Sequence, residues 1–249
     1  LEYYRWWNIG LFKGIVPSNG ILEIPAEVDG IKVNKIELTE AECRELFGIY
    51  SPNTWPVLFN AAANNSTVYY NTEVKKIIIP YGVTEIGAAA FCNMENLEIV
   101  EIPDTVTKIG DYAFSGCKNL TKLKCNKSII LTGILAFHNC ILLPRVDGKI
   151  YGNLPDKSFL NCMSLAEFSF YDKGTTMGQG CFEDCVNLTR LYIYQDLELT
   201  DAFLEEHKEA EFFCGDKSKY LSLIHFGYKV MMFNTWLNIK SIPNHVVGG

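Results

Sequence analysis

Val83-Thr84-Glu85-Ile86-Gly87-Ala88-Ala89-Ala90-Phe91 is followed, 23 residues later, by Val106-Thr107-Lys108-Ile109-Gly110-Asp111-Tyr112-Ala113-Phe114. The two segments share valine, threonine, isoleucine and glycine at their starts, and alanine and phenylalanine at their ends. A repeat of this length indicates that the chain uses one structural unit several times.

Four columns of residues continue in the same phase downstream, at steps of 22 or 23 residues. The columns are Phe91, Phe114, Phe137, Phe159 and Phe182; Met94, Cys117, Cys140, Cys162 and Cys185; Leu97, Leu120, Leu143, Leu165 and Leu188; and Val100, Leu123, Val146, Phe168 and Leu191. Agreement in one column is weak evidence, but four columns in phase identify five consecutive units.

A unit of this length cannot bury its own apolar face, so neighbouring units must stack and share one core. In each unit a segment such as Val100-Glu101-Ile102 alternates as a short strand, with Val100 and Ile102 inward and Glu101 outward. We expect the phenylalanine column to fill the interior. We expect the glycine column to adopt dihedral angles that other residues avoid. Its members are Gly87, Gly110 and Gly178.

The pattern Val-Thr-x-Ile-Gly-x-x-Ala-Phe-x-x-Cys-x-x-Leu-x-x-Leu resembles the leucine-rich repeat of the BspA-like bacterial surface proteins, over residues 83–194. The resemblance implies an α/β fold, a right-handed solenoid with short parallel strands on a concave face. The flanking residues predict a β-hairpin N-terminal cap and a mixed C-terminal cap. The third and fourth units depart from the pattern at Thr132, Pro155 and Ser158, which replace isoleucine, glycine and alanine. We therefore expect irregular coils there.

The repeat divides the chain into four segments: an N-terminal cap with a partial repeat at 1–36, a helical insertion at 37–73, the repeats at 74–194, and a C-terminal cap at 195–249. Ser18-Asn19-Gly20 between apolar runs predicts a hairpin over residues 12–24. Thr39 and Glu42 fit a capping box, which predicts a helix over 40–47. Thr200 predicts a helix cap, and apolar runs predict strands at 211–214, 220–226 and 228–233.

The composition is that of a folded protein, with 249 residues, of which 48% are hydrophobic and 20% charged. The net charge of −7 argues against nucleic acid as a partner, since phosphate binding needs a basic surface. No run approaches the ~20 apolar residues of a membrane helix. The first residues lack the basic and apolar regions of a signal peptide, so we expect a mature or trimmed chain whose export route the sequence does not indicate.

Nine cysteines are an odd number, so at least one is unpaired within the chain. In a stack the cysteine column has parallel side chains, which fit disulfide geometry poorly, so we favour reduced, buried thiols. A zinc site at Cys181 and Cys185 is the alternative, but no histidine lies nearby in the sequence.

The outward strand positions are the candidate binding surface. The hypothesis assigns ligand binding to Lys122, Lys124, Arg145, Glu167, Arg190, Tyr192 and Tyr194. Arginine and tyrosine are typical of interface hot spots, and alternating Glu101, Lys124 and Asp147 place opposite charges on adjacent strands. A solvated sheet face is the alternative. In the insertion, Tyr50, Trp55 and Phe59 are either exposed anchors or packed onto the stack.

No pattern of residues indicates an enzyme. His138, His207, His225 and His245 are scattered, with no metal-binding or hydrolase spacing, and no phosphate or dinucleotide motif occurs. We expect no cofactor, no metal, and a monomer. The resemblance implies a cell-surface or secreted protein-binding or adhesion module, with a host matrix or cell-surface protein as the ligand. A structural spacer domain is the alternative, and chemistry in the insertion or the C-terminal region comes third.

Overall fold

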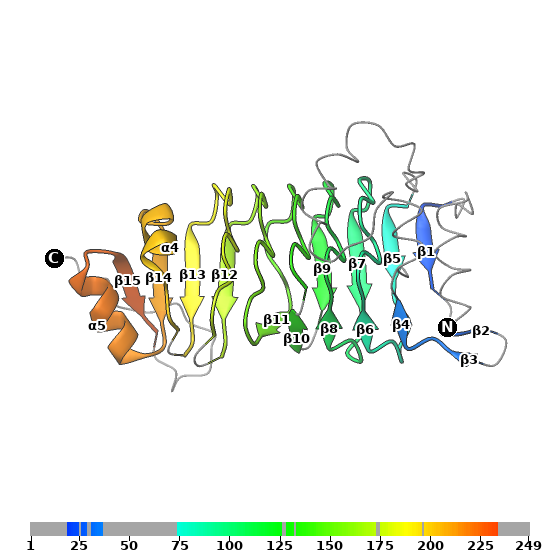
Figure 1. Cartoon of the computed structure of the whole chain (residues 1–249), viewed down its shortest axis with the longest axis horizontal. Coiled ribbons are helices and arrows are strands. Elements are labelled where there is room, and N and C mark those ends of the chain that lie inside the picture. Colours follow the sequence, from blue (N-terminus) through cyan, green and yellow to red (C-terminus); the bar gives the residue numbers. More distant parts are fainter. Residues whose placement is uncertain are drawn as a thin grey trace.

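The computed structural model describes residues 19–24, 26–28, 31–36, 74–125, 128–131, 133–172, 175–195 and 197–233. The first strand of the expected hairpin, the insertion with its helix and three aromatic residues, and His245 lie outside these residues. Within them, the chain forms a parallel-strand β-solenoid whose coils stand side by side in one row (Figure 1).

Two sheets, each made of parallel strands, lie on one long side of the row (Figure 1). The first sheet has the order β1 (Ile21–Glu23), β5 (Lys76–Ile78), β7 (Ile99–Ile102) and β9 (Lys122–Cys125). The second has the order β12 (Glu167–Phe170), β13 (Arg190–Ile193), β14 (Glu211–Cys214) and β15 (Lys229–Met232). Within the repeats, partners in the register are 23 residues apart, as in Val100 beside Leu123 and Phe168 beside Leu191. The repeat in the sequence is therefore the coil of the solenoid.

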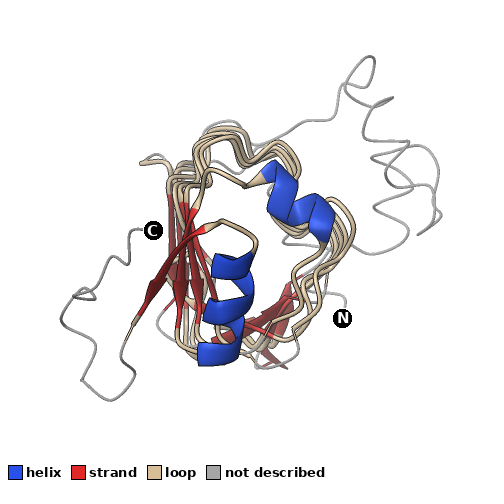
Figure 2. Ribbon diagram, turned by 90° about the vertical axis from the view of Figure 1, so that its left-hand side faces the viewer, coloured by secondary structure: helices blue, strands red, loops and turns tan. Residues whose placement is uncertain are grey.

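A third parallel sheet is formed by the other leg of each coil, and the view along the row shows strands on two sides of the outline (Figure 2). Its order is β11 (Lys149–Tyr151), β10 (Ser128–Leu131), β8 (Lys108–Ile109), β6 (Glu85–Ile86) and β4 (Lys35–Ile36). Near the N-terminal end, β2 (Glu27–Val28) and β3 (Ile31–Lys32) pair in antiparallel fashion. The handedness of the coil and the concavity of the strand side stay predictions.

The phenylalanine column is one file of buried rings, as expected. Successive ring centroids are 5.5, 5.3, 5.2 and 5.5 Å apart from Phe91 to Phe182, and the last three pairs are tilted by 8° or less. None of the five side chains is more than 2% exposed. The rings form the centre of a core that runs the length of the stack.

The cysteine column lies beside the rings as buried free thiols. The Sγ atoms of Cys117, Cys140, Cys162 and Cys185 each donate to the carbonyl oxygen of the phenylalanine one coil earlier, at 3.1–3.2 Å. This is the contact between a weak thiol donor and the turn backbone that a small buried cysteine can make. Burial raises the pKa of Cys117 and of Cys185 to about 12, so these thiols stay protonated.

The expected reason for the glycine column is wrong. Gly87, Gly110 and Gly178 do not have positive φ. Instead, successive glycines allow close backbone approach: a Cβ on Gly110 would lie 3.1 Å from the carbonyl carbon of Gly87, and one on Gly178 would lie 2.4 Å from the amide nitrogen of Asp156. The column is therefore a packing requirement between coils.

The expected irregularity falls in the middle of the chain. Leu131, one residue earlier than the period places it, is the partner of Ile109 in the third sheet. Residues 145–147 form no strand, so the first and second sheets are separate on the same side of the row. The strand side is therefore interrupted at the coil that carries Arg145 and Asp147.

The C-terminal region continues the second sheet. Thr200 caps α4 (Asp201–Glu206), as expected, through its side chain, which accepts a hydrogen bond from the amide of Phe203. The strand expected at 220–226 is wrong, because α5 (Lys217–His225) is a helix capped by Asp216. It lies beside β14 and β15 at the end of the stack (Figures 1 and 2).

Helix is scarce in the described part of the chain, where α4 and α5 are the only helices. Both are short, and neither has the length and apolar character needed to cross a membrane. The architecture of the described residues is therefore a β-solenoid with helix at one end.

Candidate functional site

Twelve outward side chains from six consecutive coils form the strand face. They are Lys76, Ile78, Ile99, Glu101, Lys122, Lys124, Arg145, Asp147, Glu167, Ser169, Arg190 and Tyr192. None of them is buried, whereas Leu123 and Leu191, which alternate with them on β9 and β13, are at most 1% exposed. Strand alternation thus presents one continuous surface and buries the other half of each strand.

Glu101 joins three neighbouring strands on this face. Its carboxylate lies 3.0 Å from the Lys76 ammonium and 2.5 Å from that of Lys124. The hydrogen bond from Lys124, followed by that from Lys76, lowers the pKa of Glu101. The expected pairing of Glu101 with Lys124 is therefore present.

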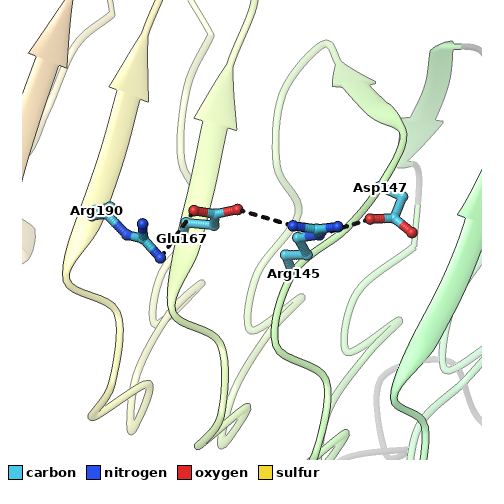
Figure 3. A network of polar contacts seen from close by, with 4 residues as sticks. All are labelled: Arg145, Asp147, Glu167 and Arg190. Atoms are coloured by element: carbon cyan, nitrogen blue, oxygen red, sulfur yellow. Dashed lines mark hydrogen bonds and ion pairs between the residues drawn. The ribbon is translucent and has the colours of Figure 1, made fainter. Parts of the chain in front are cut away.

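Glu167 has the same role further along the face, where it lies between two arginines (Figure 3). Its carboxylate oxygens lie 3.8 Å from Arg145 Nη1 and 3.2 Å from Arg190 Nη2. Arg145 Nε also donates to Asp147 at 2.9 Å. Asp147 was expected to continue the alternation across strands, but its partner in the structure lies two residues away on its own coil.

Tyr192 and Tyr194 belong to two different aromatic contacts. The Tyr192 ring stacks on Phe213 of β14, with centroids 4.7 Å apart. The Tyr194 ring stacks on Tyr171 at 4.7 Å and meets the edge of Phe233 at 4.9 Å. Burial, then the neighbouring Tyr171 hydroxyl, raises the pKa of Tyr194 to about 12. The candidate tyrosines are therefore half-buried side chains in fixed positions.

Several of these aromatic partners were missed by sequence reasoning. Tyr171 stacks on Tyr151 with centroids 5.8 Å apart, and Lys149 Nζ lies 5.2 Å from the centre of the Tyr171 ring. Tyr171 precedes Tyr194 by one repeat, so the phase could have identified it. Phe233 reaches over Gly215, where a Cβ would lie 3.2 Å from the Phe233 ring. No motif or spacing in the sequence predicts the contact between Phe233 and Gly215.

A shallow groove of about 590 Å³ lies at the ends of β5, β7 and β9. Its lining includes the charged residues Glu101, Lys124 and Asp147 and the apolar residues Ile102 and Pro103. The groove joins the charged part of the strand face to the turns below it. A side chain of a ligand that crosses the face could enter it.

The described residues offer little for catalysis. Ser115 Oγ lies 3.1 Å from His138 Nδ1, but Ser115 is wholly buried, so its hydroxyl is closed to a substrate. Burial, then the Lys157 charge, lowers the pKa of His138 to about 4. Within the described ranges no cluster of three His, Cys, Asp or Glu residues could hold a metal, and Cys181 and Cys185 belong to no such cluster.

Comparison with known proteins gives a family and several solved structures. A family model described as the BspA type leucine rich repeat region matches in six copies, over residues 64–189 and 146–222. A Treponema pallidum leucine rich repeat protein is 20% identical with a TM-score of 0.49, and the match covers 65% of this chain and 87% of that one. No curated protein sequence matches.

Two further solved structures are more than twice as long as the part that this chain matches. For a leucine rich cell surface protein of Faecalibacterium prausnitzii, identity is 23% and the TM-score 0.46, with 73% of this chain and 49% of that one covered. For the pneumococcal vaccine antigen PcpA, identity is 14% and the TM-score 0.47, with coverage of 68% and 44%.

The family match extends over more than half of the chain and includes the described coils between residues 74 and 222. Its repeated unit is the one that forms the phenylalanine and cysteine columns. The chain therefore belongs to the BspA type leucine rich repeat family.

Proposed function

We propose that the chain is a non-enzymatic protein-binding or adhesion module of a cell-surface or secreted protein, and that a protein ligand lies across the strand face. The observation that carries the proposal is the face itself: six coils present aligned side chains on one open surface. The cell-surface location rests on the resemblance of the repeats to those of BspA-like bacterial surface proteins.

The composition of the face supports protein recognition. Arg190 and Tyr192 are neighbours on β13, and both residue types are enriched in the hot spots of protein interfaces. Glu167 holds Arg190 from one side and Phe213 holds the Tyr192 ring from the other. Side chains that are already held in place lose less conformational entropy on binding.

Capture of ligands by the immobilised chain tests the proposal. We expect the wild-type chain to retain a specific protein from serum or from extracellular matrix extract, and the Arg190→Ala/Tyr192→Ala variant to lose it. A Lys108→Ala/Tyr81→Ala variant is the matched control, because both side chains are exposed outside the strand face. If the strand-face variant retained the same protein as the control, this placement of the site would be wrong. The insertion at 37–73 would then be the next surface to examine.

A structural spacer is the second candidate, favoured by the in-register row of coils, which sets a length (Figure 1). The two candidates differ in the effect of deleting one repeat, residues 96–118, from the protein that contains this chain. If the chain is a spacer, the longer protein would still adhere, but its adhesive part would be presented closer to the cell. A binding module would lose ligand capture.

A further inference from the structure

The charge of the strand face differs in sign from that of the whole molecule. Five of its twelve residues are Lys or Arg and three are Asp or Glu, a formal charge of +2, whereas the chain as a whole has −7. The basic residues are Lys76, Lys122, Lys124, Arg145 and Arg190. The excess of negative charge therefore lies elsewhere on the molecule.

The carboxylates of the face do not neutralise it. Glu101 is shared by Lys76 and Lys124, and Glu167 is shared by Arg145 and Arg190 (Figure 3). The shared carboxylate fixes the positions of its two cations in each group. One positive charge of the Glu101 group is left unbalanced, whereas Asp147, which accepts from Arg145, balances the second charge of the arginine group. Both groups thus keep hydrogen-bond donors for a ligand, and the guanidinium groups are suited to carboxylates.

Lys122 lies between the two groups, in the column that also contains Arg145. Among the described residues it makes no ion pair, and its side chain is exposed. Its ammonium group is therefore available to a ligand without loss of an internal contact. Arg145 follows on the next coil, where no strand forms, and its side chain is also exposed.

We propose that the strand face binds an acidic, extended segment of a protein ligand, whose carboxylates contact Lys122, Arg145 and the cations held by Glu101 and Glu167. The proposal deepens the proposed function and rests on it. The segment runs across the strands, parallel to the row of coils, because the cations are distributed over successive coils. The negative charge of the rest of the chain repels it from other surfaces.

Fluorescence anisotropy with synthetic peptides tests the proposal. The probe is a labelled 18-residue peptide of repeated Glu-Gly-Ser, and its control has Gln in place of every Glu. With the full chain at ~20 mM NaCl we expect binding of the Glu peptide only, with an affinity that falls steeply towards ~200 mM NaCl as the charges are screened. Equal binding of both peptides, or no binding of the Glu peptide, would overturn the proposal.

Charge reversal locates the site. Lys122→Glu should weaken binding of the Glu peptide about tenfold in Kd, the change that ~1.4 kcal/mol produces. Lys108→Glu, a matched reversal on β8 outside the strand face, should have little effect. If Lys122→Glu did not fold, as judged by circular dichroism, Lys122→Gln would replace it with a smaller expected loss. Equal weakening by both reversals would indicate attraction by net charge and not a site.

A sulfated polysaccharide is the competing polyanion. If the chain bound heparin but not the Glu peptide, the ligand class would be wrong. If the Glu peptide did not bind, the proposed function would still stand, provided that Arg190→Ala/Tyr192→Ala abolished capture of a protein ligand. Loss of that dependence would refute the proposed function itself.

Discussion

At the scale of single residues, identity is set by position in the coil. Among the described residues, eight other than glycine have positive φ, which is sparsely populated for such residues, and they fall at two positions that recur along the coils. One position holds Ala89, Tyr112, Leu135 and Lys157, and the other holds Asn93, Asn139, Asn161 and Asp184. Asparagine and aspartate tolerate this conformation better than other residues, which explains the second position and not the first.

The phenylalanine file gives the first stability prediction. Phe114→Ala removes a ring that is 0% exposed and stacked on both sides, so we expect a loss of ~3–5 kcal/mol in the free energy of unfolding. Lys124→Ala on the strand face should cost ~0–1 kcal/mol. Denaturation by urea measures both. Similar losses for the two variants would contradict the inward and outward assignments.

Gly133 gives the second stability prediction. A Cβ there would lie 1.9 Å from the carbonyl carbon of Gly110, so Gly133→Ala must push two coils apart. We expect a loss of ~1–3 kcal/mol or more, as for other overpacked sites. Gly110→Ala is the graded control, because its nearest contact would be 3.1 Å and should cost less. Thermal unfolding midpoints that do not follow this order would show that the coils are not in close contact at the glycine column.

At the scale of elements, the sequence predicted the strands set by periodicity and the helix α4, but it missed the helix α5. The inward residues of β7, β9, β12 and β13 could be read from the repeat, and the helix that begins after Thr200 could be read from its cap residue. The apolar run at 220–226 suggested a strand, but Asp216 caps a helix there and only Leu223 is buried. The Gly215-Asp216 pair was the available signal.

The cap of α5 is open to a direct test. Asp216 accepts a hydrogen bond from the amide of Lys219 at 2.9 Å, so Asp216→Ala should cost ~0.5–2 kcal/mol. Asp216→Asn keeps an oxygen acceptor and should cost much less. Hydrogen exchange of the amides of residues 217–225 would show the change locally, with faster exchange in the alanine variant. Unchanged exchange would mean that the helix does not depend on this cap.

At the scale of the whole molecule, the site is harder to predict than the fold. Phase places Lys122, Arg145, Glu167 and Arg190 in one column of the sequence, and the structure brings the last three into contact. The partner of Asp147 and the reach of Phe233 over Gly215 depend on backbone detail in coils that leave the period. Periodicity therefore predicts which residues share a face, whereas the side-chain contacts need coordinates.

Two histidines are expected to make the whole fold sensitive to acid. Burial lowers the pKa of both His138 and His207 to about 4, below the ordinary 6.5, so the unfolded chain binds more protons between these values. Stability should therefore be complete above pH ~6.5 and fall as the pH drops towards ~4, by on the order of 1–3 kcal/mol per histidine. Unfolding in urea at pH 7 and pH 5 measures this. The His138→Gln/His207→Gln variant should lose less stability over the same interval. If it lost as much as the wild type between pH 7 and pH 5, these histidines would not be the cause of the acid sensitivity.

Chemical footprinting of lysines is the most direct test of the claim that a protein ligand lies on the strand face. The wild-type chain would be acetylated alone and when saturated with a captured ligand, and each lysine followed by mass spectrometry. We expect the ligand to slow acetylation of Lys122 and Lys124, while Lys108 on β8 and Lys208 after α4 react at unchanged rates. Protection of Lys108 or Lys208 with Lys122 and Lys124 still reactive would contradict the account.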